Sequence, residues 1–182
     1  MVGYKFLIAG LGNPGRAYAG TRHNIGFEAV SLLAKKHQLA FRTKLSWKGS
    51  VAVGKIKNDD VVLMKPLTFM NLSGEAIALC MRNLKIGPTH LLVIVDDIAI
   101  SLGQLRMRIN SGSGGHNGLK SVEEHLQTNR FARLRIGVGD SKEGDLVSHV
   151  LGKFSDDEKQ LVPKILEQSV SAAEIWLEKG LN

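Results

Sequence analysis

The sequence predicts a single α/β domain in which helices cover both faces of a twisted, mixed β-sheet. Two continuous apolar runs, at residues 6–11 and 91–95, have the unalternating pattern of parallel strands that are covered on both sides. Residues 51–57 and 104–109 alternate between apolar and polar side chains, which is typical of half-exposed or edge strands. Helical segments fall between these runs, and strands that alternate with helices build layered α/β folds.

Two helices are expected in the first half of the chain, one after Asn24 and one from about Ser73. Asn24 can cap a helix whose apolar face includes Val30 and Leu33. A second helix begins near Ser73 and is stopped by the glycine and proline at residues 87–88. Because polar residues follow the strands in between, we expect a site at the carboxyl ends of the strands.

The C-terminal segment gives two conflicting helix signals. Residues 155–158 fit a capping box, but Pro163 interrupts the helical pattern soon afterwards. We therefore expect a short turn followed by a final helix with Pro163 in its first turn. The apolar face of that helix consists of Leu166, Val170, Ala173 and Leu177, with Trp176 beside it.

Length and composition fit one domain that spans residues 1–182. A chain of 182 residues with 43% apolar side chains can bury a sizeable core, and neither linkers nor repeats divide it. Its apolar runs fall well short of the roughly 20 residues that cross a bilayer, so we expect no membrane partner. The single cysteine, Cys80, can form neither an internal disulfide nor a cysteine-based zinc site, which favours the cytoplasm.

The charge of the chain is unevenly distributed. The formal net charge is +7 and the sequence pI is about 9.6. Residues 1–135 carry the excess of positive charge, whereas residues 136–182 are net acidic. A basic body is compatible with a polyanionic partner such as nucleic acid, although many basic proteins bind none.

Several classes of enzyme can be excluded because their sequence motifs are absent or incomplete. Residues 10–15 read GLGNPG and match the dinucleotide-binding pattern, but Pro14 and Gly20 break the segment where a helix should start. The acidic ribose ligand is also missing, since the corresponding region holds Lys35 and Lys36. The sequence contains no serine-hydrolase elbow, P-loop or zincin pair, so those reaction classes drop out.

Five polar residues remain at turns or strand ends, namely Asn13, His23, Asn71, Asp96 and Asn117. His23 precedes a helix, whose positive dipole end favours the neutral imidazole of a general base. Asp96 ends a very apolar strand, where its carboxylate could orient the imidazole. The same two residues also fit ordinary roles as a helix-capping histidine and a turn residue.

Two further features leave alternatives open. Asp97 competes with Asp96 for the role of carboxylate partner. Residues 110–118 are glycine-rich and could form an anion-binding or lid loop, or a plain flexible connection. Asparagine amides can read a peptide backbone or a ribose and can stabilise an oxyanion, but each one alone is also a common turn residue.

Long motifs in a fixed order resemble the bacterial-type peptidyl-tRNA hydrolase family. They are GLGNPG at 10–15, TRHN at 21–24, PLTFMNLSG at 66–74, GSGGHNGLKS at 112–121, RLRIG at 133–137 and VLGKF at 150–154. The resemblance spans nearly the whole chain. It implies a monomeric esterase without metal or cofactor that cuts the ester between a peptide and the terminal ribose of tRNA, and so recycles tRNA from stalled translation.

The resemblance also implies a role for each matching residue. His23 corresponds to the catalytic base and Asp96 to its carboxylate partner. The positioning asparagines are Asn13, Asn71 and Asn117, the contacts to the substrate end are Tyr18 and Phe69, and the clamp on the tRNA 5′-phosphate consists of Arg108 and Arg135. The chain departs from the family pattern in residues 96–103, where Ala99 replaces an acidic residue and a proline is missing before Gly103.

Two other classes of protein remain as alternatives. An RNA-binding module of the same fold would bind tRNA without turnover, and it differs from the enzyme only in catalysis. A nucleotide-dependent oxidoreductase is the third possibility, and it would be stabilised by dinucleotides.

Overall fold

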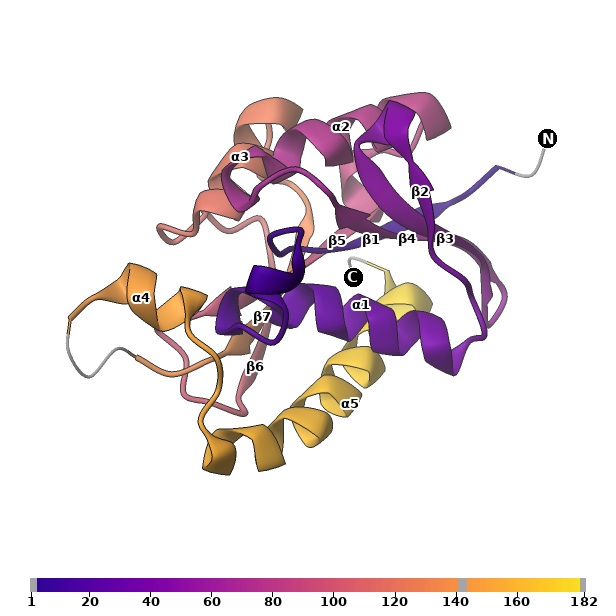
Figure 1. Ribbon diagram of the computed structural model, residues 1–182. Helices are drawn as coiled ribbons and strands as arrows, with labels where there is room; N and C mark the ends of the chain where they lie inside the picture. The colour runs from indigo at the N-terminus through magenta and orange to yellow at the C-terminus, as the bar shows by residue number, and fades with distance from the viewer. Residues whose placement is uncertain (1–2, 141–143, 181–182) are drawn as a thin grey trace.

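A computed structural model describes residues 3–140 and 144–180, and within them a seven-stranded sheet lies between two pairs of longer helices (Figure 1). The strands are β1 Phe6–Gly10, β2 Arg42–Lys44, β3 Gly49–Ile56, β4 Asp59–Pro66, β5 Leu91–Asp97, β6 Leu105–Ile109 and β7 Ala132–Gly137. The helices are α1 Ile25–Lys36, α2 Ser73–Leu84, α3 Asn117–Leu126, α4 Leu146–Leu151 and α5 Asp156–Lys179.

The sheet is mixed, as the sequence predicts. Its strand order is β2-β3-β4-β1-β5-β7-β6, and the four strands β4, β1, β5 and β7 are mutually parallel. The two continuous apolar runs form β1 and β5, which lie side by side in the centre of the sheet. Of the alternating segments, β6 is an antiparallel edge strand, while β3 is half-exposed and has β2 outside it.

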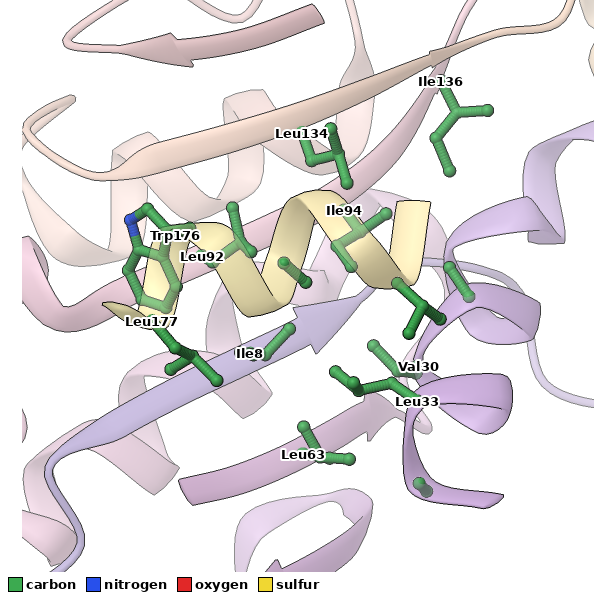
Figure 2. Close-up of a cluster of buried hydrophobic side chains, with 14 of the residues drawn as sticks. Ile8, Val30, Leu33, Leu63, Leu92, Ile94, Leu134, Ile136, Trp176 and Leu177 are labelled. Atoms are coloured by element: carbon green, nitrogen blue, oxygen red, sulfur yellow. The ribbon is translucent and has the colours of Figure 1, made fainter. Parts of the chain in front are cut away.

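Each face of the sheet has its own apolar core. Helices α1 and α5 cover one face, and α2 and α3 cover the other. Figure 2 shows the first core, where Trp176 and Leu177 of α5 and Val30 of α1 pack over Ile8 and Leu92 of the central strands. The prediction of helices on both faces is therefore confirmed.

The prediction of a break at Pro163 is wrong. Helix α5 begins at the predicted capping box, in which Ser155 and Glu158 bond each other's backbone N–H, and it continues through Pro163. A proline inside a helix removes one backbone hydrogen bond, but the capping box and the buried face that includes Ala173 stabilise the helix on both sides of it. Although α5 has 24 residues, neither it nor any other helix in the described residues is apolar enough over a sufficient length to cross a membrane.

The strand order of the parallel part of the sheet changes side between the neighbouring strands β1 and β5. From β1 the chain passes through α1, β2 and β3 to β4 on one side of β1, and from β4 it passes through α2 on the other face to β5 on the opposite side of β1. Such a switch point leaves a crevice at the carboxyl ends of the two strands. The start of α1 lies very close to it, because a Cβ on Gly26 would lie 2.4 Å from the Ile94 carbonyl oxygen and one on Gly10 would lie 2.0 Å from the Gly26 carbonyl oxygen.

We predict that Gly26→Ala lowers the free energy of unfolding by about 1–3 kcal/mol, because the added methyl group overpacks the contact between α1 and the central strands. Urea denaturation measures this change. Gly87→Ala is the control, since a Cβ on Gly87 meets nothing within 4 Å and its φ is −79°. Equal stability of the two variants would contradict the close approach at Gly26.

Candidate active site

Two histidines share one carboxylate oxygen at the carboxyl end of β5. His23 Nδ1 lies 2.8 Å from Asp96 Oδ1, and His116 Nε2 lies 2.9 Å from the same oxygen. His23 belongs to a short 3-10 turn, Arg22–Asn24, that leads into α1, and His116 directly precedes α3. Asp96 is 2% exposed. The three groups therefore form a partly buried network, with Asp96 at its centre, that joins the starts of two helices to the central strand.

The backbone of α3 fixes the proton position on His116. Its Nδ1 accepts hydrogen bonds from the N–H groups of Gly118 at 3.1 Å and Leu119 at 3.3 Å, so that it caps the helix. A nitrogen that accepts two N–H donors carries no proton of its own, so the proton of neutral His116 is on Nε2. From there it is donated to Asp96.

The shared carboxylate in turn fixes His23. Burial opposes ionisation of Asp96, but electrostatic attraction and hydrogen bonds from His116 and His23 outweigh it and hold the pKa of the carboxyl well below its usual range. As a carboxylate, Asp96 accepts hydrogen bonds only, so His23 donates from Nδ1. The lone pair of His23 Nε2 is then available, and Nε2 has no hydrogen-bond partner among the described residues. This is the tautomer that a general base requires.

The same three residues are the only cluster of potential metal ligands found within the described residues, with donor atoms less than 4.8 Å apart. Two histidines and one carboxylate can bind iron or zinc. However, a neutral imidazole that binds a metal through Nε2 carries its proton on Nδ1, and Nδ1 of His116 faces two N–H donors. The geometry therefore suits hydrogen bonding better than metal binding.

Asn13 is fixed by a second buried network. Asn24 does not cap α1 with its side chain as expected; instead its amide bonds the backbone N–H and carbonyl of Asn13 at 2.8 and 2.9 Å. The side-chain oxygen of Asn13 accepts the N–H of Met70 at 2.8 Å. This bond holds the amide in one orientation, in which its NH₂ group can donate to a carbonyl of a substrate.

The other predicted substrate contacts surround this centre. Tyr18 and Phe69 meet edge to face, with ring centroids 6.3 Å apart. Asn71 and Asn117 are exposed, the first in a 3-10 turn after β4 and the second as the first residue of α3. A cavity of about 240 Å³ lies beside the cluster of His23, Asp96 and His116, and its other lining residues are Asp97, Ile98, Gly114, Gly115, Asn117, Leu146, Val147 and Val150.

The two predicted phosphate contacts differ in accessibility. Arg108 is exposed on the edge strand β6. Arg135 on β7 is only 8% exposed, and its guanidinium donates to Asp97 and to the carbonyls of Gly112 and Ser113. Asp97 is thereby paired with Arg135, which leaves Asp96 as the partner of His23.

Sequence reasoning missed His116 and the bonding role of Asn24. The sequence indicates only that His116 belongs to the glycine-rich loop, although a polar residue directly before a helix is a recognisable cap signal. Asn24 occupies the predicted N-cap position, but nothing in its spacing reveals that its amide bonds a loop eleven residues earlier. Both contacts depend on how α1 and α3 approach the ends of the central strands.

Comparisons with known proteins agree on one family. The family model described as "Peptidyl-tRNA hydrolase" matches residues 7–182. The chain is 44% identical over 175 residues to a peptidyl-tRNA hydrolase of Clostridium novyi, covering 96% of this chain and 93% of that protein. It is 43% identical over 177 residues to a peptidyl-tRNA hydrolase of Caldanaerobacter subterraneus, covering 97% and 95%.

A solved structure extends this similarity to three dimensions. The crystal structure of peptidyl-tRNA hydrolase from Acinetobacter baumannii superposes with a TM-score of 0.90 at 36% sequence identity, covering 98% of this chain and 91% of that one. Sequence and fold thus match along nearly the entire length. This chain belongs to the peptidyl-tRNA hydrolase family.

Proposed function

We propose that this chain hydrolyses the ester bond between the peptide and the terminal ribose of peptidyl-tRNA, and thereby recycles tRNA from stalled or aborted translation. The observation that carries the proposal is the hydrogen bond from His23 to Asp96, which leaves Nε2 as an acceptor on a side chain that lines a cavity. Membership of the peptidyl-tRNA hydrolase family supports the substrate.

In the proposed reaction, His23 Nε2 takes a proton from water as the water oxygen attacks the ester carbonyl. Asp96 stabilises the resulting imidazolium, and a tetrahedral oxyanion forms. Collapse of this intermediate breaks the bond to the ribose oxygen, which receives the proton from His23. The amides of Asn13, Asn71 and Asn117 and the nearby backbone N–H groups are the candidate donors to the oxyanion and to the peptide.

Selectivity for a peptidyl group follows from the orientation of Asn13. Its NH₂ group can donate to the carbonyl of the first peptide bond, whereas an unblocked aminoacyl end has an ammonium group there. We propose that half-buried Tyr18 and exposed Phe69, whose rings meet edge to face, contact the substrate end beside it.

The proposal extends to the domain organisation, oligomeric state, cofactor requirement and location of the enzyme. Residues 1–182 act as one domain and as a monomer, without a metal or another cofactor, in the cytoplasm. The cores on both faces of one sheet support the single domain, and the proton on His116 Nε2 supports catalysis without a metal.

Replacement of His23 tests the catalytic role. We predict that His23→Ala lowers kcat for N-acetyl-aminoacyl-tRNA by about 100-fold or more, because the base is lost. Release of the acyl group is followed in the presence of a chelator, and unblocked aminoacyl-tRNA is the control substrate that neither protein should cleave. If the wild-type protein binds the blocked tRNA without cleaving it, the chain is an RNA-binding module and the catalytic proposal fails.

Replacement of a residue of the proposed phosphate clamp distinguishes binding of the tRNA body from recognition of the ester. We predict that Arg108→Ala raises KM for tRNA substrates and reduces the slope of log KM against log salt by about 1, since one phosphate contact is lost. Lys164→Ala removes an exposed charge from α5, on the opposite face of the sheet, and should leave both quantities unchanged. If Arg108→Ala raised KM for a minimal ester without the tRNA body as much as it raises KM for tRNA substrates, this result would contradict a phosphate contact.

Arg135 is proposed as the second phosphate contact. A phosphate can reach it only in exchange for a present partner, because the guanidinium is buried and donates to Asp97 and to the carbonyls of Gly112 and Ser113. Loss of Arg135 should therefore affect the loop over the ester as well as tRNA binding, whereas loss of Arg108 affects tRNA binding alone.

A further inference from the structure

A cavity at the β2 edge of the sheet lies apart from the candidate active site. Its volume is about 660 Å³, and it shares no lining residue with the cavity beside His23. Tyr4, strands β2 and β3, the turn that holds Trp47 and the end of α2 form its walls. Since β2 and β6 are the two edge strands, this cavity and the exposed Arg108 on β6 lie at opposite sides of the molecule (Figure 1).

Two basic side chains of β2 face the cavity from the same side of the sheet. Arg42 and Lys44 both line it, and they are separated by one residue of a strand, along which side chains alternate. Arg42 pairs directly with Val51 of β3, which belongs to the core under α2 and α3, so both cations lie on that face. Alternate residues of a strand are about 7 Å apart, so two long basic side chains can reach the oxygens of one phosphate group.

Neither cation is neutralised by a carboxylate. Arg42 and Lys44 form no ion pair within the part of the chain that the structure describes, and Glu75 of α2 pairs with Lys48 instead. Lys44 Nζ lies 4.3 Å from the ring centroid of Trp47. A cation on an aromatic face keeps its full charge. An anion can therefore bind Lys44 without displacing an acidic side chain.

The charge of Lys44 also acts on the core beneath the cavity. Burial raises the pKa of the Cys80 thiol on α2 to about 12, whereas the positive charge of Lys44 acts to lower it. Lys44 therefore extends along the face of the sheet toward α2, where its charge lies close to the cavity.

The rest of the lining is mostly apolar and aromatic. Trp47 and Val51 are buried in the core under α2, and Tyr4 and Leu84 pack against it. Val53 is 43% exposed and extends this apolar surface outward. A cavity of this volume is large enough for a small molecule. Its chemistry suits a ligand with a ring system at one end and a strongly anionic group at the other.

We propose that this cavity binds a nucleotide through its terminal phosphate group, whether the nucleotide is free or stands at the end of an RNA. Arg42 and Lys44 bind the phosphate, whose charge is close to −2 at neutral pH. The base and sugar pack against Tyr4 and Val53. A carboxylate on an acyl chain is the competing ligand, but its single charge leaves one of the two cations without a partner. The site is separate from His23, so its failure would leave the proposed hydrolysis unaffected.

Calorimetric titration with adenosine 5′-monophosphate (AMP) tests the site. The wild-type protein should bind AMP about tenfold more tightly than adenosine or inorganic phosphate, because only AMP occupies both parts of the cavity. Arg42→Ala and Lys44→Ala should each weaken AMP binding by about tenfold, since each removes a hydrogen bond to a charged group. Lys164→Ala is the matched control, because it removes an exposed lysine of α5 that does not line the cavity, and it should leave the affinity unchanged.

Tryptophan fluorescence reports where AMP binds. The chain has two tryptophans, and Trp176 is buried in the core on the opposite face of the sheet. AMP should change the emission of the wild-type protein, because the phosphate draws Lys44 away from the Trp47 ring. Trp176→Phe should keep this change and Trp47→Phe should lose it. If one of these variants fails to fold, the other one still identifies the responding tryptophan.

The outcomes are distinct. AMP binding that Arg42→Ala and Lys44→Ala weaken and Lys164→Ala keeps supports the site. A 5′-phosphorylated RNA trinucleotide that binds as tightly as AMP identifies an RNA end as the ligand, whereas binding of AMP alone identifies a free nucleotide. The proposal is overturned if AMP does not bind at millimolar concentration, or if octanoate binds in its place. It is also overturned if only Arg108→Ala weakens AMP binding, because the nucleotide then occupies the proposed tRNA clamp.

Discussion

The candidate active site depends on one buried carboxylate oxygen. Asp96 Oδ1 accepts hydrogen bonds from His23 and His116, and this sharing fixes the proton position on both imidazoles. The arrangement requires three parts of the chain to meet, namely the end of β5, the turn before α1 and the turn before α3. Close packing makes this possible, because Gly26 lets the start of α1 approach the backbone of Ile94 on β5 without an intervening side chain.

The site lies at the carboxyl ends of the central strands, where the two faces of the sheet meet. Side chains alternate along a strand, and Met107 packs against the core under α1 and α5, so the neighbouring Arg108 points toward the face of α2 and α3. Under the proposed function, the tRNA body would therefore approach from the side of the sheet that α2 and α3 cover.

The local sequence pattern was sufficient to predict most of the fold, but it did not predict the contacts that complete the site. The apolar runs and the capping box identified the central strands and the start of α5, because those signals lie within a few neighbouring residues. Pro163 misled the prediction because packing further along α5 outweighs a local break. His116, Asn24 and the pairing of Arg135 with Asp97 could not be derived, since each contact joins segments that only the tertiary fold brings together.

The most direct test of the shared carboxylate is ¹⁵N NMR of the histidine side chains near neutral pH. The account predicts that His23 carries its proton on Nδ1 and that Nε2 is free, whereas His116 carries its proton on Nε2 and its Nδ1 accepts the N–H groups of α3. Asp96→Asn provides the comparison, because it replaces the carboxylate that both imidazoles bond. A proton on His116 Nδ1, or on Nε2 of neutral His23, would contradict the account.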